Sequence, residues 1–381
     1  MIPYATQTIE EADLAAVRAV LTSGWLTQGP AVPRFEQAFA LVHQVRHACA
    51  VSNATAGLHL ACLALGVGPG DWVWTSPISF VASANCGIYC GAQVDFVDVE
   101  LSTRNMSVAA LAEKLLVAKR LNKLPKVVIP VHFAGLPCDM VSLRDLADEY
   151  GFALLADASH AVGASFNGMP VGSQYADISV FSFHPVKIIT TGEGGMVTTN
   201  DAQLAARIES LRSHGITRDP QQMQAVPEGV WAYEQQALGF NYRLSDIQAA
   251  LGIAQLERLP TFHAMREVLA SNYPALLDGL GLVLPEVPNS YRSSWHLYAV
   301  QLSSDRARVF AQLREEGIGV NVHYLPIYLP PFQRSLWGFS EGYCPNAETY
   351  YRGALSLPLY PKLGAEQQQQ VAHALRRAIS A

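Results

Sequence analysis

The sequence carries little charge for its length. Of its 381 residues, 15% are Asp, Glu, Lys or Arg, and the formal net charge is −6. Nucleic acids and anionic membrane surfaces are recognised through dense positive charge, so this composition argues against both as partners. A small anionic ligand remains compatible with it, because backbone amides and a few cations can supply positive potential inside a pocket.

The chain also lacks paired cysteines and long hydrophobic segments. Its six cysteines form no CxxC pair, show no metal-ligand spacing and lie in apolar stretches. We therefore expect buried thiols, a reducing compartment and no bound metal. No run of about eighteen apolar residues occurs, and the first residues, MIPYATQTIEEADL, lack the basic start and apolar core of a signal peptide. These features predict a cytoplasmic protein.

Half of the residues are hydrophobic, which in a chain of 381 residues is enough for a large domain and a smaller one. Between residues 50 and 200, short β-rich runs alternate with helical patterns, as in βαβ units. Helices are expected over residues 55–65 and 142–150. Because most of the β-rich runs are continuously apolar, helices should cover both faces of a mostly parallel sheet. The expected strands are residues 72–75, 93–99, 126–132, 153–157, 178–183 and 195–199.

The second half of the sequence predicts a connecting helix followed by a small α+β domain. Residues 244–259 are amphipathic, with Ser245 as a possible N-cap. Beyond them we expect strands over residues 295–302 and 321–324 and a helix over residues 365–379. The predicted domains are residues 1–255, an N-terminal segment with the large domain, and residues 256–381.

One lysine stands at the centre of the most informative stretch, FSFHPVKIITTGEGGM at residues 181–196. There a strand leads into a loop that carries Lys187 and then into a glycine-rich turn. This position places the amine at the carboxyl edge of the sheet, where open α/β folds bind ligands, and partial burial would favour the neutral, nucleophilic form. A surface lysine covering the loop is the alternative interpretation.

A carboxylate is expected at the same edge. The segment FALLADASH places Asp157 at the end of an apolar strand, where it could pair with a protonated pyridine nitrogen. A helix N-cap or loop aspartate is equally compatible with this segment alone. His160, three residues later, could hydrogen-bond a cofactor or cap the turn.

A phosphate site is expected where VSNATAGLHL, residues 51–60, leads into a helix. A helix N-terminus offers unpaired N–H groups and a positive dipole end to an anion. Thr55 and Ala56 would donate there, Ser182 could add a donor, and Phe80 could stack on an aromatic ring; an ordinary capped helix and a core phenylalanine are the alternatives. Together, the lysine, carboxylate, phosphate-binding helix and aromatic side chain match the requirements of pyridoxal 5′-phosphate (PLP).

Over essentially its whole length, the sequence resembles the DegT/DnrJ/EryC1 sugar aminotransferases, which have the α/β, fold-type-I PLP architecture of aspartate aminotransferase. The resemblance is carried by VSNATAGLHLACLALG, TSPISFVASANC, PVHFAGLPCDM, DASHAVGA, SFHPVKIITTGEGG, RSHGITRD and LGFNYRLSDIQAALGIAQL. Within the group, LTQGP, SSWHLYAVQL and VHYLPIY are most similar to the transaminases that make UDP-4-amino-4,6-dideoxy-N-acetyl-β-L-altrosamine in the pseudaminic acid pathway.

The resemblance implies Lys187 as the Schiff-base lysine, Asp157 as the pyridine partner, and Asn241 as a phosphate ligand reaching across a homodimer with shared active sites. It implies L-glutamate as amino donor and a UDP-linked 4-ketosugar as acceptor. Alternatives are another nucleotide 4- or 3-ketosugar, or a PLP-dependent sugar dehydratase. The positions that match nucleotide-sugar contacts are Tyr4, Leu26, Thr27, Gln28, Gly29, His323, Tyr324, Leu325 and Pro326.

Overall fold

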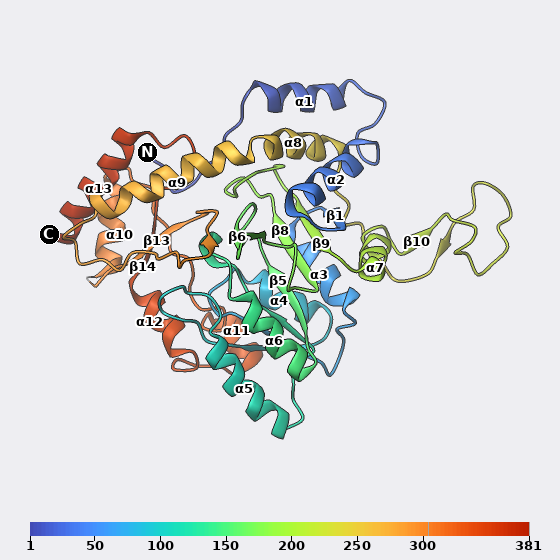
Figure 1. The fold of residues 1–381 in the computed structure, drawn as a ribbon, viewed down its shortest axis with the longest axis horizontal. Helices are drawn as coiled ribbons and strands as arrows, with labels where there is room; N and C mark the ends of the chain where they lie inside the picture. Colours follow the sequence, from blue (N-terminus) through green and yellow to red (C-terminus); the bar gives the residue numbers. More distant parts are fainter. Residues whose placement is uncertain (304, 381) are drawn as a thin grey trace.

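The computed structural model describes residues 1–303 and 305–380. Its centre is a seven-stranded sheet with the strand order β1-β9-β8-β5-β4-β2-β3 (Figure 1). Neighbouring strands pair in parallel except at β9, which is antiparallel to both β1 and β8. The predicted mostly parallel sheet is confirmed. Its strands are β1 His47–Val51, β2 Trp72–Thr75, β3 Gln93–Phe96, β4 Val127–Ile129, β5 Ala153–Asp157, β8 Ile178–Ser182 and β9 Gly195–Thr199.

Strands β2, β5 and β9 have the predicted bounds, whereas β3, β4 and β8 are shorter than predicted. Strand β1 was missed. Its sequence, HACAV, is short, and its first two residues are only partly buried, so it gives little periodic signal. Antiparallel pairing with β9 along all five residues fixes it as a strand. Residues 47–51 therefore form a strand because of their pairing with β9 and not because of a local sequence signal.

Helices cover both faces of the sheet, as the apolar strands predict. On one face, α3, α4 and α7 pack on Val73, Val127 and Val180. On the other face, α5 and α6 pack on Trp74, Val128 and Leu154. The helices that precede α8 are α1 Glu11–Leu21, α2 Ala31–His43, α3 Ala54–Ala64, α4 Ala82–Tyr89, α5 Val108–Arg120, α6 Met140–Tyr150 and α7 Ala202–Arg212, with a 3₁₀ turn at Phe133–Gly135.

The predicted connecting helix is α8, Asp246–Glu257, and it is followed almost at once by α9, Leu259–Leu276. Ser245 is its N-cap, as predicted: the Ser245 hydroxyl accepts from the Gln248 amide, and the Gln248 side chain accepts from the Ser245 amide. The two helices run from the sheet to the C-terminal part of the chain (Figure 1). They join the two regions as a nearly continuous span.

In its described residues, the C-terminal part contains a two-stranded antiparallel sheet and four helices. The predicted helix at residues 365–379 is confirmed as α13, and the predicted strand at 295–302 is reduced to β13. The prediction of a strand at 321–324 is wrong, because only Asn321 makes an isolated bridge, to Ser356. The elements are β13 Tyr298–Gln301, β14 Ala354–Leu357, α10 Arg306–Glu315, α11 Pro331–Trp337, α12 Pro345–Gly353 and α13 Ala365–Ser380.

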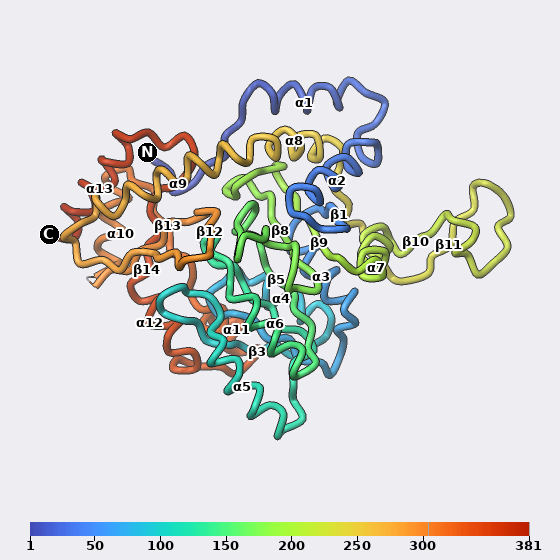
Figure 2. The backbone as a smooth tube through the Cα atoms, viewed as in Figure 1, coloured from blue at the N-terminus to red at the C-terminus, as the bar shows by residue number. Residues whose placement is uncertain are grey.

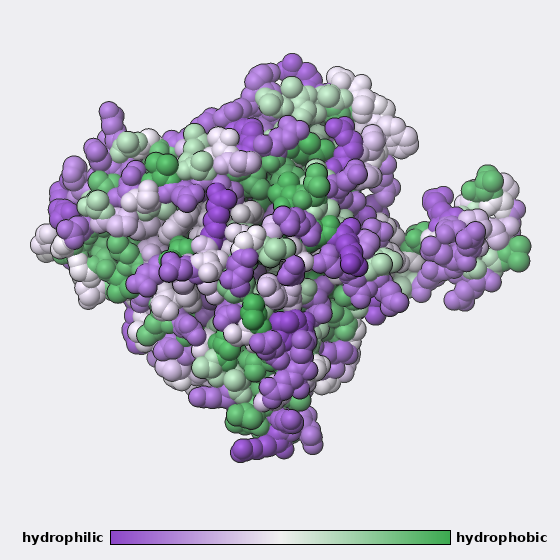
Figure 3. Space-filling model, in the orientation of Figure 1, coloured by the Kyte–Doolittle hydropathy of each residue, from purple (hydrophilic) through white to green (hydrophobic). Residues whose placement is uncertain are grey.

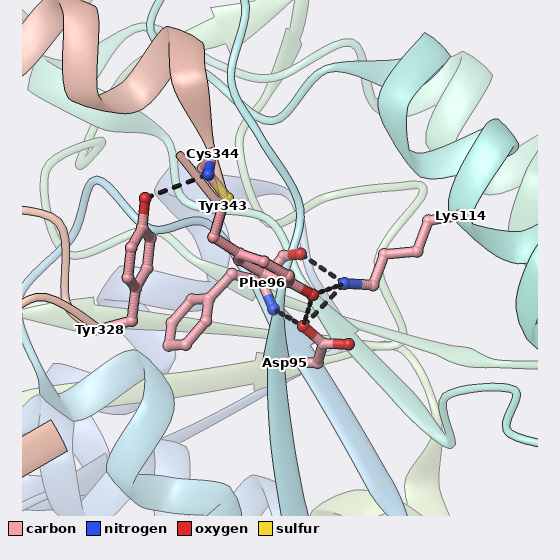
Figure 4. A network of polar contacts seen from close by, with 6 residues as sticks. All are labelled: Asp95, Phe96, Lys114, Tyr328, Tyr343 and Cys344. Atoms are coloured by element: carbon pink, nitrogen blue, oxygen red, sulfur yellow. Dashed lines mark hydrogen bonds and ion pairs between the residues drawn. The ribbon is translucent and has the colours of Figure 1, made fainter. Parts of the chain in front are cut away.

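The edge of the sheet at β3 is covered by the C-terminal part (Figure 4). The Lys114 ammonium of α5 donates to the Phe96 carbonyl at 2.7 Å and to the Tyr343 hydroxyl at 2.9 Å, and it pairs with Asp95 at 2.7 Å. The Tyr343 hydroxyl also donates to Asp95. These contacts hold Tyr343 against the edge strand, and Lys114 satisfies one backbone carbonyl of that strand.

A hairpin arm formed by residues 216–235 projects from the body (Figures 1 and 2). Its strands are β10 Ile216–Thr217 and β11 Glu234–Gln235. Val226, Val230 and Trp231 are exposed on it, and apolar atoms are visible near its end (Figure 3). A further three-stranded sheet consists of β6 Ser165–Phe166, β7 Met169–Pro170 and β12 Tyr291–Arg292. Among the described residues, no helix has both the length and the apolar character needed to cross a membrane.

Candidate active site

A cavity of about 840 Å³ opens at the carboxyl ends of β5 and β8. The sequence predicts Lys187 and Asp157 at this same edge of the sheet. The cavity is surrounded by the start of α3, the loop after β2, the loop after β8 and the C-terminal part. Its lining includes nine of the predicted site residues: Lys187, Asp157, Thr55, Phe80, His160, Ser182, Tyr4, His323 and Tyr324.

Lys187 lies in the loop that follows β8. Its amide donates to the carbonyl of His184 at 2.9 Å, which closes a turn and directs the side chain to the cavity. Burial lowers the pKa of Lys187 to about 8, and the nearby Asp157 carboxylate opposes that shift. A substantial fraction of the amine is therefore neutral near pH 8, as a nucleophilic lysine requires.

Asp157 is the last residue of β5 and is 5% exposed. Its carboxylate accepts from the Ser83 hydroxyl at 2.6 Å and from the Ser159 amide at 3.1 Å. Among the described residues it has no ion-pair partner within 4 Å. A buried carboxylate is costly without a cation, and a protonated pyridine nitrogen in the cavity would supply one. The residues present therefore fit the cofactor that the sequence predicts.

The phosphate end of the predicted site is the start of α3. Thr55 lines the cavity, and so does Ser182, the last residue of β8. Ala56 was predicted to donate its amide to the phosphate. In the structure this amide donates to the Asn53 side chain at 2.8 Å, and Ala56 is buried and does not line the cavity. Asn53, the N-cap, lines the cavity itself. Sequence reasoning gave it no role, although its place before an apolar helix is an N-cap signal.

His160 is held in one protonation state by its neighbours. Its Nδ1 accepts from the Ala134 amide at 3.3 Å, and its Nε2 lies 3.3 Å from the Tyr324 hydroxyl. Burial, reinforced by the charge of Lys187, lowers the pKa of His160 well below its ordinary value. The ring is therefore neutral with its proton on Nε2. His296, whose ring centre is 4.3 Å away, packs behind it and was missed by sequence reasoning.

Several predicted residues do not line this cavity. Leu26, Thr27 and Gln28 are exposed, and Gly29 lies so close to Asp246 that a Cβ would be 2.3 Å from its carboxylate. Asp246 also accepts from the amides of Ala31 and Val32, which holds this loop on the start of α8. The residues outside the lining are Leu26, Thr27, Gln28, Gly29, Asn241, Leu325 and Pro326, with Ala56. Phe80 is on the lining but 61% exposed, at the mouth.

The lowered pKa of Lys187 predicts how the cofactor-free enzyme takes up PLP. Below pH 8 the neutral fraction of the amine falls about tenfold per pH unit, so the rate of covalent loading should fall in the same proportion. Above pH 8 the rate should level off. Stopped-flow measurement of the absorbance of the lysine-bound cofactor between pH 6 and 10 checks this. A rate that keeps rising up to pH 10 would indicate an ordinary, solvated lysine.

The DegT/DnrJ/EryC1/StrS aminotransferase family matches residues 7–376. The spore coat polysaccharide biosynthesis protein SpsC of Bacillus subtilis is 38% identical over 98% of this chain and 96% of its own. Helicobacter pylori PseC, an aminotransferase of pseudaminic acid biosynthesis, is 30% identical with a TM-score of 0.91 over 100% and 99% of the two chains. The PLP form of the putative sugar aminotransferase Spr1654 from Streptococcus pneumoniae is 28% identical, with a TM-score of 0.89 over 100% and 98%. The predicted fold, cofactor and enzyme class are confirmed.

Proposed function

The chain belongs to the DegT/DnrJ/EryC1/StrS aminotransferase family, and we propose that it moves the amino group of L-glutamate to C4 of a UDP-linked 4-keto-6-deoxy-N-acetylhexosamine. The product would be UDP-4-amino-4,6-dideoxy-N-acetyl-β-L-altrosamine, a precursor of pseudaminic acid. The observation that carries the proposal is the convergence of Lys187 and Asp157 in one cavity that has room beside them for a sugar. The likeness to PseC supports the choice of sugar.

Each half of the reaction needs a proton moved at a carbon atom. PLP supplies, when bound, an aldehyde that links to amines and a ring that takes up electron density. Lys187 would hold the cofactor until the donor amine displaces it, and would then take the proton from the α-carbon of glutamate. Asp157 would keep a proton on the ring nitrogen. In the second half, Lys187 would deliver a proton to C4 of the acceptor sugar.

The sugar end of the cavity would be formed by Tyr4, His323 and Tyr324, which meet there from the N-terminal segment and the C-terminal part. The rings of Tyr4 and His323 lie 5.4 Å apart. Because His160 donates its only proton to the Tyr324 oxygen, the Tyr324 hydroxyl hydrogen is free to bind an acceptor oxygen in the cavity. The nucleotide would extend beyond the lining of this cavity, and its contacts there would come from Leu26, Thr27, Gln28, Gly29, Leu325 and Pro326.

Products formed from a panel of UDP-, dTDP- and GDP-linked 4-keto and 3-keto sugars with L-glutamate test the choice of substrate. Mass spectrometry should show amination of the UDP-linked 4-ketosugar, and NMR should show the altro configuration at C4. Faster turnover of a dTDP sugar or a 3-ketosugar would contradict the assignment. Loss of water from the sugar without stoichiometric consumption of glutamate would favour the dehydratase alternative.

Replacing His323 with alanine should raise the KM for the nucleotide sugar by about tenfold, the cost of one lost polar contact. His323 faces the cavity, and its Nδ1 is anchored by the Ser356 hydroxyl at 2.8 Å. The affinity for PLP, measured by fluorescence titration, should stay unchanged. Reduced PLP affinity with an unchanged KM would place His323 on the cofactor instead.

A homodimer with shared active sites is also part of the proposal. Asn241 is exposed and lies outside the cavity of its own chain, at the base of the arm, where it bridges to Ser213. Apolar side chains exposed on the arm favour burial against a second copy.

We also place the enzyme in the cytoplasm, because its six free cysteines are maintained in a reducing compartment.

Replacing Asn241 with alanine should weaken PLP retention by about tenfold, since one donor to the phosphate is lost across the interface. Cofactor dissociation after dilution, followed by absorbance, measures the effect, and light scattering verifies the dimer. Gln221→Ala, an exposed polar change on the arm, is the control and should have no effect. Normal retention in a verified Asn241→Ala dimer would contradict the assignment.

A further inference from the structure

A second, much smaller cavity of about 10 Å³ shares Lys187 with the candidate active site. Its lining also includes residues 6–8 of the N-terminal segment, Gln255 on α8 and Arg266 on α9. A cavity of this size holds about one water-sized particle. Gln7 is an exposed part of the lining, so the cavity lies close to the surface of the chain.

Two buried polar side chains on this lining are only partly satisfied. Thr8 is 6% exposed and Arg266 is 1% exposed. Neither the Thr8 hydroxyl nor the Arg266 Nε makes a hydrogen bond to any residue that the structure describes. Buried polar groups normally have a partner, and both of these groups can donate a hydrogen bond. The cavity therefore offers two donors to a small ligand that accepts hydrogen bonds.

The positive charge of Arg266 is also uncompensated. Its Nη1 donates to the carbonyls of Trp295 and Leu359, each at 3.0 Å, but these groups carry no net charge. Within the described ranges, no carboxylate lies within 4 Å of its guanidinium nitrogens. Burial lowers the pKa of Arg266 to about 10, which still leaves the group protonated at neutral pH. A buried cation without a counter-ion is costly, so this position favours a negative charge nearby.

We propose that this cavity binds a monatomic anion, chloride, held between the Thr8 hydroxyl and the Nε–H of Arg266. The ionisable side chains on the lining are Arg266 and Lys187, which are both basic, and the lining contains no Asp or Glu. A water molecule would satisfy the two donors but would leave the guanidinium charge uncompensated, whereas a chloride ion does both. The size of the cavity excludes polyatomic anions such as phosphate and carboxylates.

A bound anion would join segments that are far apart in the sequence. Thr8 belongs to the N-terminal segment, and its carbonyl already accepts from the Gln255 side chain of α8 at 2.9 Å. Arg266 belongs to α9 and holds the carbonyls of Trp295 and Leu359 in the C-terminal part. The ion would complete the contact between these two groups of residues. Because an unfolded chain does not form this site, chloride should stabilise the folded state.

The first measurement is thermal unfolding of the full-length holoenzyme in potassium chloride and in potassium gluconate at equal ionic strength. Chloride should raise the midpoint by about 2 °C at ten times its Kd, because it binds the folded state alone. Bromide should act like chloride, whereas gluconate is too large to enter the cavity. The midpoint as a function of chloride concentration gives the Kd.

The second measurement places the ion. In crystals of the holoenzyme soaked in sodium bromide, anomalous scattering at the bromine absorption edge should show a bromide ion between the Thr8 hydroxyl and the Arg266 Nε. Crystals grown in gluconate without a halide should show no anomalous peak there.

A matched pair of variants tests the role of the hydroxyl. Thr8→Val removes one donor with little change of shape and should weaken chloride binding by about tenfold. Thr22→Val, at an exposed threonine that ends α1, is the control and should respond to chloride like the native enzyme. Thr8 is a better position for the test than Arg266, because Arg266 also holds the two carbonyls and its loss could unfold the chain.

Three results would overturn the proposal. Equal midpoints in chloride and gluconate, or a bromide-soaked crystal without an anomalous peak between Thr8 and Arg266, would mean that the cavity holds a water molecule only. An unchanged Kd for chloride in Thr8→Val would place the ion elsewhere. All of these measurements are made without sugar or amino donor, so their outcome does not depend on which sugar is aminated.

Discussion

Lys187→Ala is expected to lower turnover by at least about 10⁴-fold, since it removes both the covalent attachment of the cofactor and the base that moves the proton. The folded state should survive. The Lys187 side chain faces the cavity and has no hydrogen bond or ion pair with the rest of the described chain. Removing a partly buried amine whose protonation is disfavoured also relieves a desolvation cost, so the midpoint of thermal unfolding should not fall.

The measurement combines steady-state kinetics, thermal unfolding and borohydride reduction followed by peptide mapping. In the native enzyme, reduction should fix the cofactor on the peptide that contains Lys187, and in the variant that label should vanish. Lys362→Ala, at an exposed lysine outside the cavity, is the control and should keep full activity. Label on another lysine, or substantial transamination by Lys187→Ala, would remove the basis of the proposed mechanism.

The sequence predicts the site residues whose position follows from the neighbouring sequence, such as the end of an apolar strand or the start of a helix. Asp157 and Lys187 follow continuous apolar runs that form buried strands, and parallel strands bring their carboxyl ends to one edge. Thr55 lies on a helix whose start is marked by small and polar residues. These residues are found together because strand order places β5 beside β8, with α3 packed over both.

The parts that the sequence does not predict depend on contacts between distant segments. His296 reaches His160 across more than a hundred residues, and Ser83 reaches Asp157 from another helix. The amide of Ala134, in the turn after β4, donates to Nδ1 of His160 and so places the ring proton on Nε2. No periodicity or spacing encodes these contacts. Likewise, residues 321–324 have the composition of a strand, but in the fold they lie against the cavity.

Asp157→Asn should lower kcat by about 10²–10³-fold, the cost of removing one preorganised charge from a buried site. The change is nearly isosteric, and its hydrogen bonds can be kept. The Asn oxygen can accept from the Ser159 amide, while the Asn nitrogen donates to the Ser83 oxygen. Ser83 can reverse its own proton because the Ser79 hydroxyl, 2.6 Å away, can act as donor or acceptor. The fold and the covalent link to Lys187 should therefore persist.

What the variant loses is the negative charge that keeps the ring nitrogen protonated. Loading it with a cofactor analogue whose ring nitrogen is permanently charged should restore much of the lost rate, because the analogue no longer needs Asp157 to hold the proton. Asp201→Asn, which alters the N-cap of α7 on the surface, is the matched control and should leave kcat unchanged. Normal kcat in Asp157→Asn would mean that the carboxylate only caps the turn through Ser159. A low kcat that the charged analogue cannot raise would point to lost packing between Asp157 and Ser83. Either result would count against the electron-sink role, which is indicated by a buried carboxylate with no ion-pair partner among the described residues.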